Sequence, residues 1–171
     1  MKGLTLLTAF LLVFMVSARS ARADEIGGKI YETWTIYEDS ELVDNVTCRV
    51  EDNPCIKFGA SNITLKLNGF TITGPAHPPA NCVAPANFPS EDGIDVVDQH
   101  DVAILGPGLV ERFESVGILL RGSTRAKVKG VTASDNCFSG IFLLATMDSD
   151  IEGNVSVRNS IGSQGLACGG T

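Results

Sequence analysis

The sequence is short of the residues on which most enzyme chemistry depends. It has only two histidines in 171 residues. It also contains no zinc-ligand spacing, no glycine-rich phosphate loop and no paired nucleophile and base. Apolar residues do not recur at the 3.6-residue spacing of an amphipathic helix, which excludes helical repeats. These absences point away from a resident zinc ion, from nucleotide chemistry and from a helical fold.

Basic residues are also scarce, with 13 lysines and arginines against 20 aspartates and glutamates. Removal of the first 23 residues would take away three of the basic ones and leave a net charge of −10. A surface that acidic disfavours nucleic acid and anionic lipid as partners. An acidic polysaccharide stays possible, because a calcium ion could bridge two sets of carboxylates.

Residues 1–23 predict a secretory signal peptide. Lys2 supplies the positive end, Leu4 to Val16 the apolar core, and Ala21-Arg22-Ala23 a cleavage site of the small-x-small type. The 13 residues of the apolar core are too few to span a bilayer as a permanent helix. We therefore expect a secreted mature protein, extracellular or periplasmic, with no membrane span.

The main feature of the mature chain is a short pattern that is repeated three times. Glycine leads each copy, in "GIDV", "GILL" and "GIFL", and the copies are 24 and 23 residues apart. A second glycine follows 13 residues after each leading one. A period of this size indicates a solenoid of stacked coils. The two glycine columns are Gly93, Gly117 and Gly140, then Gly106, Gly130 and Gly153.

Between the two glycine columns, residues 101–105 align with residues 125–129 and then with residues 148–152. The second and fourth positions are small or apolar and the others are mostly charged, which is typical of a strand with one buried face. Outward charges of opposite sign would then lie about 4.8 Å apart on adjacent strands. The predicted pairs are Arg125 with Asp148, Lys127 with Asp150, and Lys129 with Glu152.

The pattern predicts an all-β fold, a parallel β-helix solenoid of about four to five coils of about 23 residues. The usual crossover rule makes the helix right-handed. The stretch "NITLKLNGFTITG", with "GIDV", "DVAILGPG", "GILL" and "GIFL", resembles the pectin-lyase-like superfamily of secreted β-helix proteins. The resemblance covers roughly residues 30–171 and implies the fold more specifically than it implies a function.

The chain divides into three parts under this prediction. Residues 1–23 are the signal peptide, residues 24–55 form an N-terminal cap with entry strands, and residues 56–171 form the repeats. Within the first coil, Ile63, Leu65 and Leu67 point inward, and Leu67 is taken as the equivalent of Ile104. The last coil carries no capping segment, so we expect further coils or a partner at the C-terminal end.

Residues 75–90 interrupt the period with five prolines and no strand pattern. Such an insert must leave the solenoid as a loop. Because binding sites concentrate on loops, it is a candidate wall of a binding site. A surface excursion without a function explains it equally well.

All five cysteines follow the predicted signal peptide, where oxidation is possible. A bridge between Cys48 and Cys55 would close a small loop and add roughly 2–3 kcal/mol of stability. The other three, Cys82, Cys137 and Cys168, are an odd number, so at least one of them is free or bonded outside this chain.

An acidic cluster precedes and includes the first repeat strand. In the superfamily, glycosidases that act on galacturonans place several aspartates on one outward face of the β-helix, and "EDGID" at residues 91–95 is similar to their first aspartate motif. The resemblance implies Asp92, Asp95 and Asp98, under the 75–90 loop, as candidate catalytic residues. The next coil departs from that pattern, since it has Val116 and Leu119 where a pair of aspartates is expected.

A structural interpretation competes with the catalytic one. Asp95 is the outward middle position of its strand, equivalent to Leu119 and Phe142. Asp98 would lie in a turn, and Asp101 would stack on Arg125. This interpretation needs no substrate and is the one that the pattern favours.

Two further residues are candidates for substrate binding. Lyases of the superfamily combine carboxylate-bound calcium with a basic residue that abstracts a proton, and outward Lys66 and Lys57 are available for that role. Calcium is therefore a possible cofactor, although the sequence defines no metal-ligand set. Trp34 could be a stacking platform for a sugar ring, or it could be a cap residue over the apolar core of the first coil.

Two functions fit these observations. The first is a secreted protein that binds an extracellular polysaccharide on its outward face, with cleavage by a hydrolase or lyase reaction left open. The second is a non-catalytic adhesion or scaffold solenoid. Asn136 and Asn159 are 23 residues apart, so they are predicted to stack in adjacent coils. Asparagine side chains in that arrangement can bond backbone groups along a turn.

Overall fold

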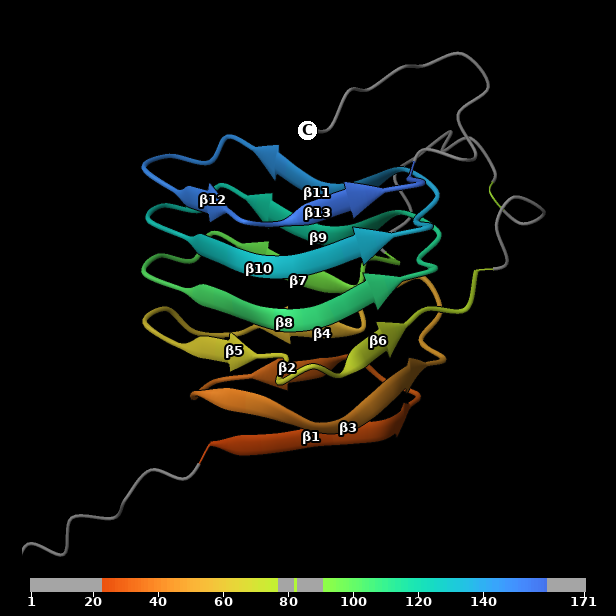
Figure 1. Cartoon of the computed structure of the whole chain (residues 1–171). Coiled ribbons are helices and arrows are strands. Elements are labelled where there is room, and N and C mark those ends of the chain that lie inside the picture. Colours follow the sequence, from red (N-terminus) through yellow and green to blue (C-terminus); the bar gives the residue numbers. More distant parts are fainter. Residues whose placement is uncertain (1–22, 77–81, 83–90, 160–171) are drawn as a thin grey trace, which may run out of the picture.

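The computed structural model describes residues 23–76, 82 and 91–159. These residues contain strands and no helix, and every pairing between named strands is parallel. The strands form two sheets that face each other across one core (Figure 1). The larger, sheet A, has the strand order β1-β3-β5-β8-β10-β12, while β6 pairs with β3 and β8 and β13 pairs with β10. Its strands are β1 (Asp24–Ile30), β3 (Ser40–Cys48), β5 (Thr64–Lys66), β6 (Thr71–Thr73), β8 (Ala103–Glu111), β10 (Lys127–Ser134), β12 (Asp150–Glu152) and β13 (Val155–Val157).

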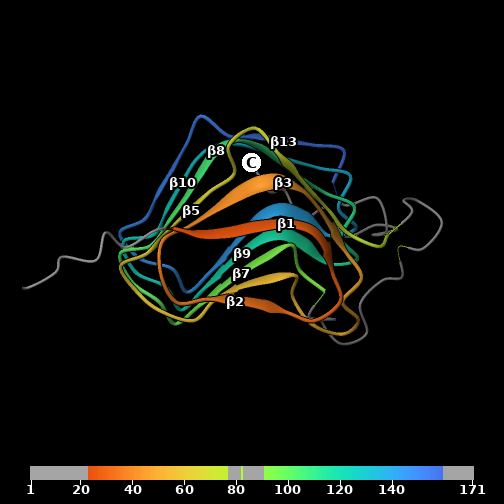
Figure 2. The same cartoon turned by 90° about the horizontal axis from the view of Figure 1, so that it is seen from below.

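The smaller sheet, sheet B, has the strand order β11-β9-β7-β4-β2. The chain passes from one sheet to the other and back, so that each strand lies against the equivalent strand of the next coil, and the coils superpose when seen along the stack (Figure 2). The predicted cap residues 24–55 take part, since β1, β2 and β3 already belong to the sheets. The strands of sheet B are β2 (Trp34–Ile36), β4 (Ile56–Phe58), β7 (Ile94–Val97), β9 (Val116–Arg121) and β11 (Ser139–Leu144).

The predicted register of the three copies is confirmed. In sheet A, Val128 pairs with Ile104 on one side and with Ile151 on the other. In sheet B, Ile118 pairs with Ile94 and with Ile141. The inward side chains build one continuous core, in which Ile104, Val128, Ile94 and Ile118 are buried. The core exists because one-residue alternation sends every second side chain inward at every level of the stack.

The register of the first coil differs from the prediction by two residues. Leu65, and not Leu67, pairs with Ile104. The error arose because the two sheet A segments of a coil are joined by connections of different length in different coils. Four residues separate Lys66 from Thr71, whereas the paired segment of β8 has three between Leu105 and Leu109. A shift of two residues leaves the inward and outward assignment intact, so Ile63, Leu65 and Leu67 are buried as predicted.

Left-handed residues form the corners of the coils. Asp98, Gly122 and Ala145 occupy one column with φ of 54°, 61° and 51°. Non-glycine residues seldom adopt this conformation, and Asp and Asn are among those that tolerate it best. The column explains the glycine, because a Cβ at Gly122 would approach Asp98 Oδ1 to 2.2 Å. Two further corner columns have the same geometry: Asp101, Arg125 and Asp148, then Arg112, Asp135 and Arg158.

Asparagine side chains link successive coils, as predicted for Asn136 and Asn159. Asn136 accepts a hydrogen bond from Phe113 N–H at 3.1 Å, and Asn159 accepts one from Asn136 N–H at 3.0 Å. The amide nitrogen of Asn136 also donates to Val110 C=O, at 3.3 Å. These bonds satisfy backbone groups that the corners leave without a strand partner.

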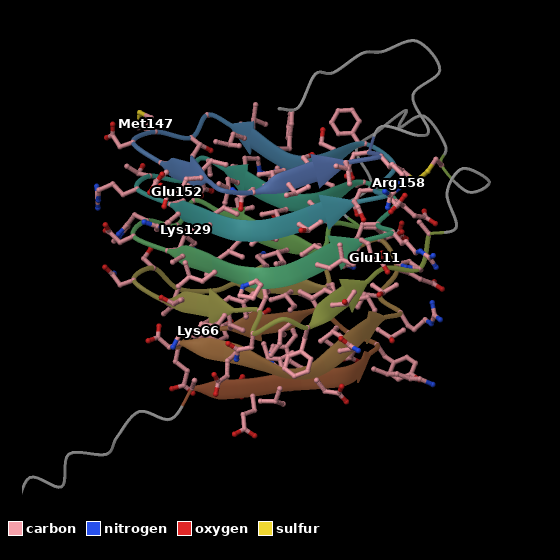
Figure 3. The ribbon with its side chains drawn as sticks, in the orientation of Figure 1. Lys66, Glu111, Lys129, Met147, Glu152 and Arg158 are labelled. Carbon is pink, nitrogen blue, oxygen red and sulfur yellow. A yellow bond between two sulfur atoms is a disulfide. The ribbon has the colours of Figure 1, made fainter. Side chains whose placement is uncertain are left out.

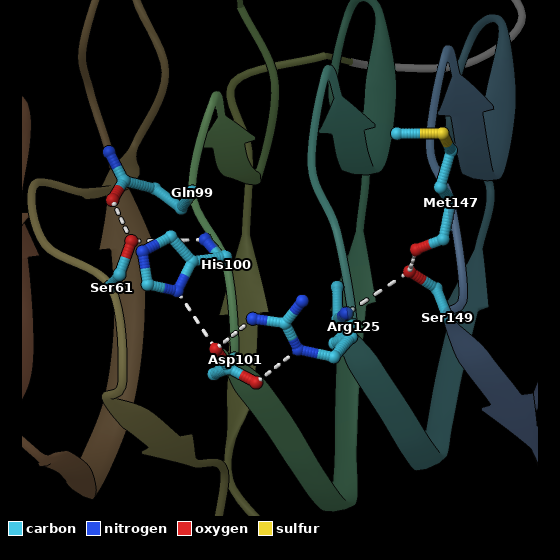
Figure 4. Close-up of polar contacts among 8 residues, drawn as sticks. Ser61, Gln99, His100, Asp101, Arg125, Met147 and Ser149 are labelled. Atoms are coloured by element: carbon cyan, nitrogen blue, oxygen red, sulfur yellow. Dashed lines mark hydrogen bonds and ion pairs between the residues drawn. The ribbon is translucent and has the colours of Figure 1, made fainter.

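Ion pairs follow the outward positions of sheet A. Lys127 Nζ lies 3.1 Å from Asp150 Oδ2, as predicted. Lys129 pairs with Glu152, also as predicted (Figure 3). In the third predicted pair, Asp148 lies in the same corner column as Arg125 and raises the pKa of Arg125 only through its charge, whereas the predicted stacking of Asp101 on Arg125 is confirmed. Arg125 forms a two-pronged contact with Asp101 of the preceding coil, at 2.7 and 2.5 Å (Figure 4). Asp101 is on the same corner column, and its second oxygen also contacts His100 Nδ1 at 2.8 Å.

Two disulfides join described residues. The predicted bridge between Cys48 and Cys55 is present and joins the end of β3 to the residue before β4. The second bridge joins Cys82, within the proline-rich insert, to Cys137 at the corner before β11. The predictions for the signal peptide, for most of the insert, for Cys168 and for the C-terminal end concern residues outside the described ranges.

Candidate functional site

Asp95 occupies the middle of β7, on the outward side of sheet B. Its neighbours in the register are Lys57 of β4 and Leu119 of β9. An outward position would normally be open to water, yet Asp95 is only 7% exposed. Its Oδ1 atom is buried and has no hydrogen-bond partner among the described residues. Burying a carboxylate oxygen without a partner is costly, and among the described residues this holds for Asp95 Oδ1 and for Glu91 Oε2.

The charges around Asp95 work in opposite directions. Burial raises the pKa of its carboxyl group, and the nearby cations Arg121 and Lys57 lower it in part. Arg121 lies two residues beyond Leu119 on β9, and therefore on the same side of the sheet. The outward face of sheet B thus presents a desolvated carboxyl group between two cationic side chains.

Asp92 lies two residues before the start of β7 and is buried. Burial raises the pKa of Asp92 to about 6, and the negative charge of Asp95 adds to the shift. A hydrogen bond from the Ser115 side chain and one from Val116 N–H, at 3.0 Å, oppose that shift. Asp92 therefore uses its oxygens to anchor the first residues of β9, which is a structural role.

A second group of carboxylates surrounds Glu114, at the corner between β8 and β9. Burial raises the pKa of Glu114, and the neighbouring Glu91 and then Asp52 raise it further. Glu91 also accepts a hydrogen bond from Asp52 N–H at 2.8 Å. Sequence reasoning named Glu91 but missed Glu114 and Asp52, because the three come from three different coils.

The third predicted catalytic residue, Asp98, lies apart from this environment. It is an exposed corner residue in the left-handed conformation, and its backbone N–H donates to Arg121 C=O at 2.8 Å. The structure therefore brings Asp92 and Asp95 into electrostatic contact and leaves Asp98 in the turn. The position of Asp98 agrees with the structural interpretation of that residue.

The two predicted substrate-binding residues lie in other places. Lys66 is on β5, where it pairs with Glu41 and Leu105 in sheet A, so it does not share a face with Asp95. Lys57, the other lysine considered, is the one beside Asp95. Trp34 is on β2 at the edge of sheet B, in register with Ile56. The alternation of the strand could have identified Arg121, because it lies two residues after the outward Leu119 and therefore also points outward.

The carboxylates near Asp95 do not fit a calcium ion. Within residues 23–76, 82 and 91–159, no three side chains of His, Cys, Asp or Glu are grouped as a metal site. The groups facing Asp95 are the cations Lys57 and Arg121, which would repel a divalent ion. We therefore derive no step that involves calcium.

Comparison with known proteins identifies no relative of this chain. No family model, no curated protein and no solved structure matches the chain. The part of the chain that the structure describes contains no helix of the length and apolar character needed to cross a membrane. Any function must accordingly be argued from the residues themselves.

Proposed function

We propose that this protein is a secreted right-handed parallel β-helix of the pectin-lyase-like kind, which binds an extracellular polysaccharide on the outward face of sheet B. The stacked parallel sheets and the two disulfides support the architecture and an oxidising compartment. A solenoid face suits a linear polymer, because its rungs repeat at about 4.8 Å along the stack.

The observation that carries the proposal is the state of Asp95. Its Oδ1 atom lacks a hydrogen-bond partner, although Lys57 and Arg121 are close enough to influence its charge. Sugar hydroxyls are good donors to a carboxylate, and the flanking cations can bond hydroxyl or carboxylate oxygens of the same polymer. Lys57 and Arg121 are exposed and are the groups that a polymer meets first, while Asp95 lies buried between them and would be reached only by a hydroxyl group inserted between the two cations.

The geometry supports binding more directly than cleavage. Hydrolysis needs one carboxylic acid that protonates the leaving oxygen and a second that activates water or attacks. Asp92 has a pKa of about 6, in the range of a general acid, but Ser115 and Val116 already occupy its oxygens. Asp98 stands in a corner. Of the three candidate aspartates, only Asp95 is left to activate a water molecule for hydrolysis.

The test is a binding and activity panel with matched variants. The secreted protein is presented with plant, algal and bacterial polysaccharides, and affinity electrophoresis measures binding. New reducing ends and ultraviolet absorbance of unsaturated products measure cleavage, with and without calcium. We expect Asp95→Asn to weaken binding by at least about tenfold. Asp150→Asn, which alters an exposed carboxylate on sheet A, should leave binding unchanged. Equal affinity of both variants would contradict the assigned face.

A specific observation favours a second function, that of a non-catalytic scaffold. The outward charges of sheet A and of the corners are engaged with charges of neighbouring coils, in the pairs Asp101–Arg125, Lys127–Asp150 and Asp135–Arg158. Such a surface stiffens the stack and offers few free groups to a ligand. If a folded protein binds none of the polysaccharides, the scaffold becomes the better description.

A further inference from the structure

A second candidate site lies at the end of the stack where β1 and β2 are the edge strands (Figure 1). The segment between these two strands borders an open depression of about 470 Å³. That volume falls within the range of about 300–1,000 Å³ that is usual for small-molecule sites. The depression is lined by Asp24, Lys29, Ile30, Tyr31, Glu32, Thr33, Trp34 and Thr35.

Trp34 is the central residue of this depression. Its register partner is Ile56, which continues through Ile94 to Ile118, so Trp34 ends a column of inward side chains. Because β2 is the edge strand of sheet B, no other described strand of that sheet covers the indole on its other side. Trp34 is accordingly 38% exposed, although its column is otherwise buried. The indole both covers the core and presents apolar surface to the depression.

The indole and the loop beside it are held in place. Trp34 Nε1 donates to Asp24 Oδ2 at 3.2 Å, which ties the ring to β1. Thr33 Oγ1 donates to Pro54 C=O at 2.7 Å, and Trp34 N–H donates to Cys55 C=O at 2.9 Å. Cys55 is itself fixed by its disulfide to Cys48. A site held this firmly spends little conformational entropy when a ligand binds.

The groups around the indole define the class of ligand. Tyr31 is 66% exposed and adds a second aromatic surface beside Trp34. Asp24, Glu32 and Lys29 supply polar groups around these rings, and two of the three are acidic. A ring with an apolar face and hydroxyl groups at its edge matches this arrangement. The excess of carboxylates disfavours an anionic ligand.

We propose that the depression at Trp34 binds a neutral sugar unit, and that it is separate from the face around Asp95. The choice of a saccharide rests on the proposed function, whereas the stacking surface and the charges come from the depression itself. In this arrangement the end of the solenoid recognises a neutral sugar, while the cationic flanks of Asp95 recognise the polymer along the stack.

Because Trp34 is the single tryptophan of the chain, its fluorescence reports on this depression alone. The mature protein is titrated with neutral oligosaccharides of glucose, xylose and N-acetylglucosamine, and with oligogalacturonate as the anionic comparison. We expect a saturable change of emission with at least one neutral series and none with oligogalacturonate. No saturable change with any neutral series, or a response to oligogalacturonate alone, would overturn the proposal.

Variants separate this site from a merely structural tryptophan. Calorimetry of the responding sugar should show at least about tenfold weaker binding for Trp34→Leu and for Tyr31→Ala. Trp34→Leu keeps an apolar cover over the core, and Tyr31 is exposed enough for its removal to leave the fold intact. Tyr37→Ala is the matched control, since Tyr37 is 70% exposed and does not line the depression. Unchanged affinity of Tyr31→Ala and Trp34→Leu would refute the site.

The two proposals can fail separately. If neutral sugars change the emission but Asp95→Asn binds polysaccharides normally, the site at Trp34 stands and the sheet B face falls. If polysaccharides bind in a manner that depends on Asp95 while the emission stays constant, the reverse holds. If no saccharide binds at all, both are wrong.

Discussion

The outward faces of the two sheets place charged side chains in opposite environments. On sheet A, Lys127 and Asp150 are 42% and 52% exposed, and each neutralises its neighbour at 3.1 Å. On sheet B, the equivalent outward position holds Asp95, which is 7% exposed and has an oxygen atom without a partner. A charge that is exposed and paired costs little, whereas a charge that is buried and incompletely bonded reduces stability.

The difference shows that alternation alone does not decide the environment of an outward residue. Both faces have the same period, and both are built by parallel pairing. The register neighbours are alike, since Lys127 lies between Asp150 and Ala103, and Asp95 lies between Lys57 and Leu119. What differs is burial, because Asp95 is only 7% exposed and one of its oxygen atoms has no hydrogen-bond partner among the described residues. The uncompensated position is therefore the better candidate for a ligand.

The largest expected effect tests the inward and outward assignment that the comparison assumes. Ile118→Asp would place an unpaired charge in the core between Ile94 and Ile141. We expect a loss of more than about 4 kcal/mol, enough to prevent folding. Leu119→Asn, one residue later and outward, should give a folded protein. Far-ultraviolet circular dichroism and thermal unfolding of both variants check this, and equal damage would refute the assignment.

The second expected effect concerns the corner that joins sheet A to sheet B. Asn136→Ala would leave Phe113 N–H and Val110 C=O without their side-chain partner, in a buried position. We expect the free energy of unfolding to fall by about 3 kcal/mol, since each orphaned group costs about 1–3 kcal/mol. Urea unfolding measures it. Asn53→Ala, which removes an exposed contact to Glu51 C=O, should cost much less, and a similar loss would argue against a special role for the corner.

The third expected effect is the pH dependence of stability that the buried Asp92 causes and the exposed Asp150 of sheet A does not. The pKa of Asp92 is raised from 3.8 to about 6 in the folded protein. Between these values the folded state keeps a proton that the unfolded state has lost, so the contribution of Asp92 to stability is largest at low pH and falls as the pH rises through this window. The penalty above about pH 6 amounts to about 3 kcal/mol, at 1.36 kcal/mol for each pKa unit.

Asp92→Asn should therefore flatten the pH dependence of unfolding by urea between about pH 4 and about pH 7. The raised pKa of Asp95 acts in the same direction and will leave part of the slope. Asp150→Asn on sheet A is the control for the loss of one carboxylate and should preserve the slope. If Asp92→Asn and the parent protein fall equally with pH, the proposed desolvation of Asp92 is wrong.

The sequence was sufficient for the repeats but not for the environment of the site. Periodicity fixed the pairing of Val128 with Ile104 and of Ile118 with Ile94, because inward apolar side chains must stack. It missed the shift at Leu65, since connection length varies between coils while the alternation does not. Corner residues, too, were harder to assign.

In the sequence Arg125 has two acidic neighbours, Asp101 and Asp148, and the structure places its ion pair with Asp101. The sequence also could not predict that Asp95 is buried, or that Ser115 donates a hydrogen bond to Asp92. Both features depend on residues of different coils. The pairing of Cys82 with Cys137, left open by the odd number of cysteines, likewise depends on three-dimensional proximity. Some corner contacts follow the period, as Asn136 and Asn159 show. A contact that involves the insert does not, so the repeat gives no information on the pairing of Cys82.

The smallest expected effect lies on sheet A and completes the comparison. Lys127→Met removes the ion pair with Asp150 but keeps an apolar stem against the strand, so only the charge interaction is lost. Exposed pairs of this kind contribute about 0.2–1 kcal/mol, and salt screens them. We expect a loss of about 0.5 kcal/mol in dilute buffer that disappears in high salt. A double-mutant cycle with Asp150→Asn isolates the pair. A coupling energy above about 2 kcal/mol would mean that sheet A charges hold the coils together, and that Asp95 is not the exceptional position.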